Sequence, residues 1–229
     1  MRRVGAFVLV LAAAAGAAVQ AGAAQSPKAL RAAILAAART KRSVHYTTTG
    51  GRGNVRERMV ADVAAGRGIQ RIAFTKAGRT GRVTVEVVNR NAYIRGDAFT
   101  LHDYMGFADA QAARYAGRRI ALSHTSRGYA TVAAAVTFSL FLAELQPKGK
   151  AVRIVSGTVG GKEVVGVRSS SHQHGVRLVT TLFARPGAVP LPAEEKEVVP
   201  GKNASSVAAM SRWNEPVHVT APAHAKFVG

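Results

Sequence analysis

Hydrophobic and polar residues alternate along most of the chain between residues 43 and 95. Every second side chain is apolar, which places the apolar residues on one face of a β-strand and the charged ones on the other. Short turns rich in glycine and asparagine separate the alternating segments. The pattern predicts strands that form one antiparallel sheet in sequence order, near residues 44–49, 55–63, 68–74, 82–88 and 91–95.

The same alternation predicts which face of the sheet each residue occupies. We expect Arg56, Arg58, Arg82 and Glu86 to face solvent. The opposite face should pack against helices, and it carries Tyr46, Met59, Val63, Ile72, Phe74, Val85 and Val87. A register slip of one residue would exchange the two faces, so the exposure of Val85 relative to Glu86 tests the prediction.

Helical spacing marks three other segments. Leu30, Ile34 and Leu35 predict an amphipathic helix near 27–40, with a proline in its first turn. The stretch from residue 99 to 115 predicts one or two short helices, and the apolar stretch 130–145 predicts a further helix that ends before Pro147.

Strand signals return after residue 150. A hairpin is predicted around Gly160 and Gly161, and a further strand from residue 176 onward. Prolines in the segment 187–198 predict a connection toward a sheet edge, with Glu194 and Glu195 in solvent. One or two final strands are expected between 205 and 222. The fold class is therefore α+β.

The first 24 residues have the three parts of a secretory signal peptide. Arg2 and Arg3 provide the positive start, an apolar stretch follows, and small residues surround Ala24. The chain has no cysteine, so neither disulfides nor a lipid anchor on cysteine can form. We expect a signal peptide over 1–24, a single α+β domain over 25–229, and export to the periplasm or beyond. The alternative is that 1–24 stays uncleaved as an anchor.

The chain is strongly basic, with a formal net charge of +20. Cleavage after Ala24 would remove Arg2 and Arg3 and leave +18. The basic residues are dispersed, which favours a solvated surface, although a surface of this charge also attracts polyanions. We expect transient contact with an anionic membrane surface. No nucleic-acid partner is expected, because the chain is exported and lacks nucleic-acid-binding motifs.

Few residues of the sequence suggest catalysis or metal binding. The sequence has no nucleophile elbow, zinc-protease motif or phosphate loop, so no catalytic residue and no enzyme activity are expected. His172 and His174 have a spacing that could bind a divalent ion from a strand. They lie in a polar, loop-like segment, where solvated histidines are the simpler interpretation. No metal and no cofactor are expected.

Several segments of the chain resemble the LolA-like fold, and more specifically the LppX/LprG group of bacterial carriers. They are VHYTTTG, GIQRIAF, NAYIRGDAFTL, GKEVVGVRS, LFARPGAVPLP and RWNEPVHVTAP. The resemblance implies a curved antiparallel sheet, or half-barrel, around an N-terminal helix and central helices. It also implies an apolar cavity for acyl chains, of lipoproteins in one branch and of glycolipids or phospholipids in the other. This chain departs from the lipoprotein branch because it lacks the acylated cysteine.

The sequence and the resemblance together favour a non-enzymatic carrier of a lipid or another acylated ligand. The expected cavity residues are those of the apolar sheet face together with aromatic, methionine and leucine side chains of the central helices. The latter are Tyr104, Met105, Phe107, Phe138 and Leu142. The alternative is a cell-envelope binding protein with a filled core, whose basic surface docks on an acidic polymer or a partner protein. The sequence predicts no oligomeric state.

Overall fold

The computed structural model describes residues 25–134, 136–145, 147, 149–173 and 175–228. The expected signal peptide, residues 1–24, lies outside the described residues. Within the described part, no helix is long and apolar enough to cross a membrane.

The first half of the chain forms one helix and five long hairpin-connected strands. They are α1 (Pro27–Arg39), β1 (Ser43–Arg52), β2 (Val55–Ala64), β3 (Arg67–Lys76), β4 (Arg79–Val88) and β5 (Asn91–Gly96). Each strand pairs antiparallel with the next. The predicted meander is therefore confirmed in its order and direction.

Short helices and a further meander follow. They are α2 (Ala98–Asp103), α3 (Asp109–Tyr115), β6 (Ile120–Ser123), α4 (Tyr129–Val132), α5 (Phe138–Glu144), β7 (Lys150–Val159), β8 (Lys162–Gln173), β9 (Val176–Ala184), β10 (Pro192–Val198), β11 (Ala204–Ser211) and β12 (Lys226–Phe227). The described strands form one unclosed sheet in the order β12-β6-β5-β4-β3-β2-β1-β11-β10-β9-β8-β7. All pairs are antiparallel except that of β12 with β6. The predicted fold class, a curved antiparallel sheet packed against helices, is confirmed.

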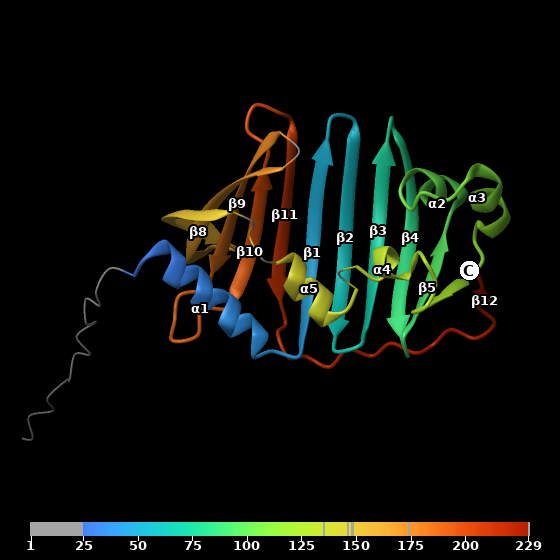
Figure 1. The fold of residues 1–229 in the computed structure, drawn as a ribbon, viewed down its shortest axis with the longest axis horizontal. Helices are drawn as coiled ribbons and strands as arrows, with labels where there is room; N and C mark the ends of the chain where they lie inside the picture. The colour runs from blue at the N-terminus through green and yellow to red at the C-terminus, as the bar shows by residue number, and fades with distance from the viewer. Residues whose placement is uncertain (1–24, 135, 146, 148, 174, 229) are drawn as a thin grey trace, which may run out of the picture.

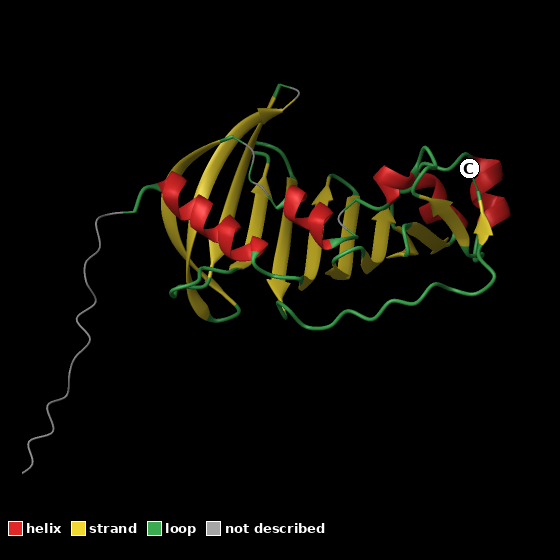
Figure 2. Cartoon of the chain, turned by 60° about the horizontal axis from the view of Figure 1, so that its bottom comes forward, coloured by secondary structure: helices red, strands yellow, loops and turns green. Residues whose placement is uncertain are grey.

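The sheet has an inner face that carries the helices and an outer face crossed by the C-terminal segment (Figure 2). At one end the strands curl strongly around α1, while α5 lies over the middle and α2 and α3 at the far end (Figure 1). Val85 is 1% exposed on the inner face, whereas Glu86 opens to the outer face with the exposed Arg56, Arg58 and Arg82. The predicted orientation of these strands is confirmed.

The helix α1 forms and docks as its sequence pattern indicates. The Ser26 hydroxyl accepts a hydrogen bond from the Ala29 amide at 3.2 Å, and Pro27 follows in the first turn. Leu30 and Ile34 are buried against the inner face, in a core cluster shared with β1, β2, β8 and α5.

Two sequence predictions are wrong. The expected helix over 130–145 is two short helices, α4 and α5, because the backbone between them packs against β3 and Thr137 is extended. Branched side chains at Val136 and Thr137 weaken the helical preference there. The expected edge connection over 187–198 contains β10, an interior strand between β9 and β11. Glu194 and Glu195, which were expected in solvent, are therefore partly buried. The only proline of β10 is its first residue, where no ladder hydrogen bond is lost.

An apolar cavity between the sheet and the central helices

A cavity of about 260 Å³ lies on the inner face, between β2–β4 and the segments around α2 and α4. Its floor is the sheet, its side is the chain that follows α2, and its roof is α4 with the residues directly after it. Its lining is mostly apolar: Met59, Gln70, Ile72, Val85, Tyr104, Met105, Thr131, Val132 and Ala134.

The floor follows directly from strand alternation. Met59 lies directly opposite Ile72 in the β2–β3 pair, and Gln70 lies opposite Val85 in the β3–β4 pair. Paired residues project to the same side of a sheet, so these side chains form one continuous surface. Met59 packs against two separate core clusters, which places the cavity at the junction between them.

The side of the cavity depends on a helix cap. The Asp97 carboxylate accepts hydrogen bonds from the Thr100 amide at 2.8 Å and from the Arg82 amide at 2.5 Å. Burial alone would raise the pKa of Asp97, but these hydrogen bonds outweigh it and lower that pKa below its usual value. The carboxylate thereby fixes the start of α2 on β4. Tyr104 and Met105 directly follow the end of α2, and both line the cavity.

The roof approaches the sheet very closely beside the cavity. Gly68 of β3 lies against the backbone carbonyl of Val136, at a separation that leaves no room for a side chain on residue 68. Val136 is fully buried, and its amide donates to the carbonyl of Ala133 at 3.1 Å. This contact fixes the connection from α4 to α5 on the inner face, and with it the roof.

Two hydrogen-bonded pairs introduce polar groups at this site. The Gln70 side-chain amide donates to the Tyr46 hydroxyl at 2.7 Å, and the Tyr104 hydroxyl donates to a Glu57 carboxylate oxygen at 3.0 Å. Burial raises the pKa of both tyrosines well above its ordinary value, and the negative charge of Glu57 adds to the shift at Tyr104. Both phenols therefore stay neutral. A mostly apolar lining with a few oriented polar groups is typical of a small-molecule site.

Five of the expected cavity residues line this cavity: Met59, Ile72, Val85, Tyr104 and Met105. The other seven do not. Six of them pack in or against the two core clusters, and the ring of Phe74 packs in a tilted arrangement against Phe99 and Tyr104. The seven residues are Tyr46, Val63, Phe74, Val87, Phe107, Phe138 and Leu142.

Four lining residues were not predicted from the sequence: Gln70, Thr131, Val132 and Ala134. Gln70 could have been found, because it is a polar residue at an otherwise apolar position of β3. The three roof residues could not, because their place depends on how the segment around α4 folds back onto the sheet.

The structure describes only one of the two histidines that have a metal-like spacing. Among the described residues, no group of three or more histidine, aspartate or glutamate side chains lies close enough to hold an ion. His172 is exposed near the end of β8 and not in a loop as expected, and His174 lies outside the described residues.

Comparisons with known proteins identify the fold. No protein-family model and no curated protein sequence matches the chain. The structure is similar to that of the Mycobacterium tuberculosis lipoprotein LppX, with a TM-score of 0.52 and 14% identity over 85% of this chain and 100% of that one. It is also similar to LprF from Mycobacterium bovis, with a TM-score of 0.54 and 13% identity over 86% of this chain and 98% of that one. The large unclosed sheet with few helices is thus the LppX/LolA-like fold.

Proposed function

We propose that this chain, which has the fold of LppX and LprF, is an exported carrier that binds a lipid or another acylated ligand without transforming it. The apolar cavity between the sheet and α4 carries the proposal. Methionine and branched aliphatic side chains form most of its wall, and methionine adapts to flexible partners such as acyl chains. The Gln70 amide has a second N–H besides the one that it donates to Tyr46, and this group offers a polar contact to the carbonyl end of such a chain.

The size of the cavity limits what it holds as it stands. At about 260 Å³ it lies just below the range of about 300–1,000 Å³ typical of small-molecule pockets. It therefore suits one short chain, or the end of a longer one. A larger ligand requires the roof to move, and the roof is formed by α4, a helix of only four residues.

Native mass spectrometry and lipid extraction of protein purified from its own host test the proposal directly. We expect a co-purifying acylated molecule. If no lipid co-purifies and the protein also takes up no acyl probe, the carrier function is refuted.

A bulky side chain in the roof should obstruct the cavity. We expect Val132→Trp to weaken binding of a fluorescently labelled palmitate about tenfold, because the indole would fill the space beside Met105 and Ile72. Ala130→Trp is the matched control, since Ala130 lies on the same helix, is exposed and does not line the cavity. Fluorescence titration measures both. Equal affinity of the two variants would show that the probe binds elsewhere.

We also propose transient contact with an anionic membrane, supported by the net charge of +20. Each basic residue near an anionic bilayer contributes about 1 kcal/mol, within a Debye length of about 8 Å at physiological salt. In co-sedimentation the protein should bind phosphatidylglycerol vesicles but not phosphatidylcholine vesicles, and binding should fade as salt rises. Equal binding to both vesicle types would contradict an electrostatic contact.

The small cavity and the basic surface also support a second candidate, a cell-envelope binding protein that docks on an acidic polymer or a partner protein. In that case the core would be filled in solution and the protein would retain no lipid through purification. The mass-spectrometric experiment therefore separates the two candidates.

A further inference from the structure

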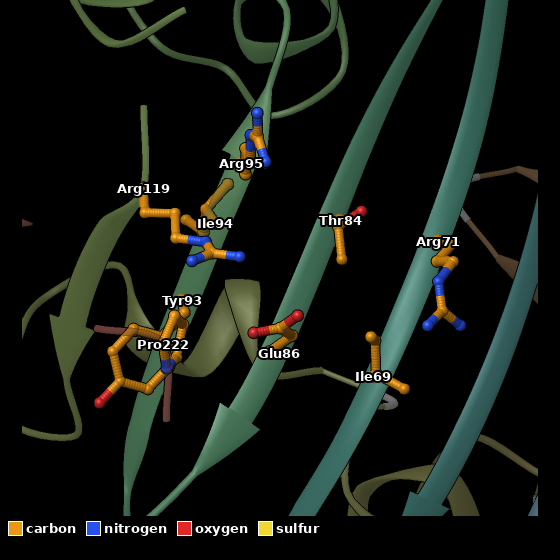
Figure 3. A pocket seen from close by; sticks show the side chains of 9 residues that line it. All are labelled: Ile69, Arg71, Thr84, Glu86, Tyr93, Ile94, Arg95, Arg119 and Pro222. Carbon is orange, nitrogen blue, oxygen red and sulfur yellow. The ribbon is translucent and has the colours of Figure 1, made fainter. Parts of the chain in front are cut away.

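We propose that a second site, on the outer face of the sheet, binds a phosphate group that neighbours a hydroxyl, as in a phosphorylated polyol. The site is the pocket formed by Arg71, Arg95 and Arg119 around Thr84 and Glu86, which we call the arginine pocket. It lies opposite the apolar cavity, under the C-terminal segment at Pro222 (Figure 3). The inference goes beyond the proposed carrier function and does not depend on it.

Strand register brings the pocket together. Arg71 of β3 pairs with Thr84 of β4, and Thr84 pairs with Arg95 of β5, so the three form one row across the sheet. Arg119 directly precedes β6, whose first residue Ile120 pairs with Ile94. Figure 3 shows Arg119 extending across β5 toward Thr84 and Glu86, with Arg71 on the far side of them.

Three arginines line this pocket against a single carboxylate, that of Glu86. None of the three arginines forms a salt bridge with any described residue. Arg95 Nε donates a hydrogen bond to the Gly117 carbonyl at 3.2 Å, and the guanidinium groups of Arg71 and Arg119 make no hydrogen bond with the described residues. Arg95 and Arg119 directly adjoin the paired residues Ile94 and Ile120, and like charges that face each other on neighbouring strands destabilise a sheet. An anion bound between them would remove that cost. Arginine forms paired hydrogen bonds with phosphate oxygens, which makes phosphate the best-suited anion.

The volume of the pocket and its other side chains restrict the class of ligand that it can bind. Its volume is about 180 Å³, below the usual range for drug-sized ligands, which fits a small headgroup better than an acyl chain. Glu86 places one carboxylate among the three guanidinium groups. A carboxylate accepts hydrogen bonds but repels an anion that has no hydrogen to donate. The pocket should therefore prefer a phosphate with an adjacent hydroxyl over sulfate.

Calorimetric titration with glycerol 3-phosphate at low salt tests the site on the full chain without its signal peptide. We expect binding by the parent protein, at least about tenfold weaker binding by R71Q/R119Q, and weaker binding of sulfate than of glycerol 3-phosphate. R58Q/R67Q is the matched control, because Arg58 and Arg67 are exposed, lose the same charge and do not line the pocket. No described side-chain hydrogen bond involves the four substituted guanidinium groups, and the glutamine variants keep the backbone hydrogen bonds. All variants should therefore fold, which circular dichroism checks.

Vesicles identify the source of the phosphate group. If it is a lipid headgroup, R71Q/R119Q should lose binding to phosphatidylglycerol vesicles while R58Q/R67Q keeps most of it. If it is a soluble molecule, both pairs should reduce vesicle binding alike, and glycerol 3-phosphate should still distinguish them. The proposal would be overturned if the parent does not bind glycerol 3-phosphate, or if both pairs lose glycerol 3-phosphate binding to the same extent. Uptake of labelled palmitate should be unchanged in every variant, so this site and the carrier function can fail separately.

Discussion

At pH 9 the Glu195→Gln variant should be more stable than the parent protein by about 3 kcal/mol, and at pH 4 the two should be equally stable. Glu195 lies on β10 opposite Leu182 and Ala208, on the inner face of the sheet. Burial raises the pKa of Glu195 to about 8, and the negative charges of Glu197 and Glu144 add to the shift. The folded protein therefore holds this carboxyl in its neutral form.

The direction of the pH dependence follows from that raised pKa. The folded state keeps the proton up to about pH 8, whereas the unfolded chain releases it near the ordinary pKa of 4.5. The stabilising contribution is complete below pH 4.5 and is lost as the pH rises to 8. One unit of pKa corresponds to about 1.4 kcal/mol, so ionisation of Glu195 can lower the stability of the folded protein by at most about 5 kcal/mol. Water around the partly exposed side chain screens its charge, and we therefore expect a loss of about 3 kcal/mol.

Urea denaturation of both proteins at pH 4 and pH 9 measures the effect. Glutamine has the shape of a neutral carboxylic acid and does not ionise, so the substitution should remove the pH dependence of stability that Glu195 causes. Glu163→Gln is the control, since Glu163 is exposed at the β7–β8 hairpin and its replacement should change stability by less than about 0.5 kcal/mol. A stability difference between E195Q and the parent that is the same at both pH values would contradict a neutral Glu195.

Replacement of Gly68 by alanine should destabilise the protein by about 2–3 kcal/mol and weaken ligand binding. A Cβ at residue 68 would lie closer to the Val136 carbonyl than the 3.0 Å that real Cβ atoms keep. The obstacle is backbone and not a flexible side chain, so the connection between α4 and α5 must move away from β3. Overpacking of this kind costs about 1–3 kcal/mol. Because that connection continues directly from the roof, the cavity should lose its shape as well.

Gly128→Ala provides the matched comparison. Gly128 precedes α4, its φ is −87°, and an added Cβ would meet only Leu122 at an ordinary 3.7 Å. We expect this variant to keep the stability of the parent within about 0.5 kcal/mol, since its backbone suits alanine. Thermal unfolding and labelled-palmitate titration test both variants. Full stability of G68A would show that the roof does not depend on this contact.

The sequence predicted the first five strands because their alternation and their glycine turns agree. Val83, Val85 and Val87 alternate with charged or polar residues, and only one register buries all three. The helix α1 was equally clear, because its apolar stripe and its proline point to the same boundaries. Local pattern and burial coincide in these elements, and this is why their orientation could be predicted.

The same reasoning failed where tertiary contacts decide. Residues 193–198 are mostly charged and follow two prolines, yet they form an interior strand because β9 and β11 both pair with them. The roof of the cavity depends on Gly68, whose role appears only once Val136 is folded against it. The arginine pocket requires the register of four strands, which dispersed arginines in a sequence do not reveal.

The open end of the sheet at β7 bears on how the protein behaves in concentrated solution. A long edge strand offers unpaired backbone groups to a neighbouring molecule, and here Val152 and Ile154 are 59% and 38% exposed. An irregular register between Ala151 and Arg153, together with the positive charge of Arg153, interrupts this edge. Electrostatic repulsion between molecules of such high net charge also keeps the edges apart, and salt weakens that repulsion. Colloidal stability should therefore be greatest in dilute buffer, with self-association through β7 favoured as ionic strength increases.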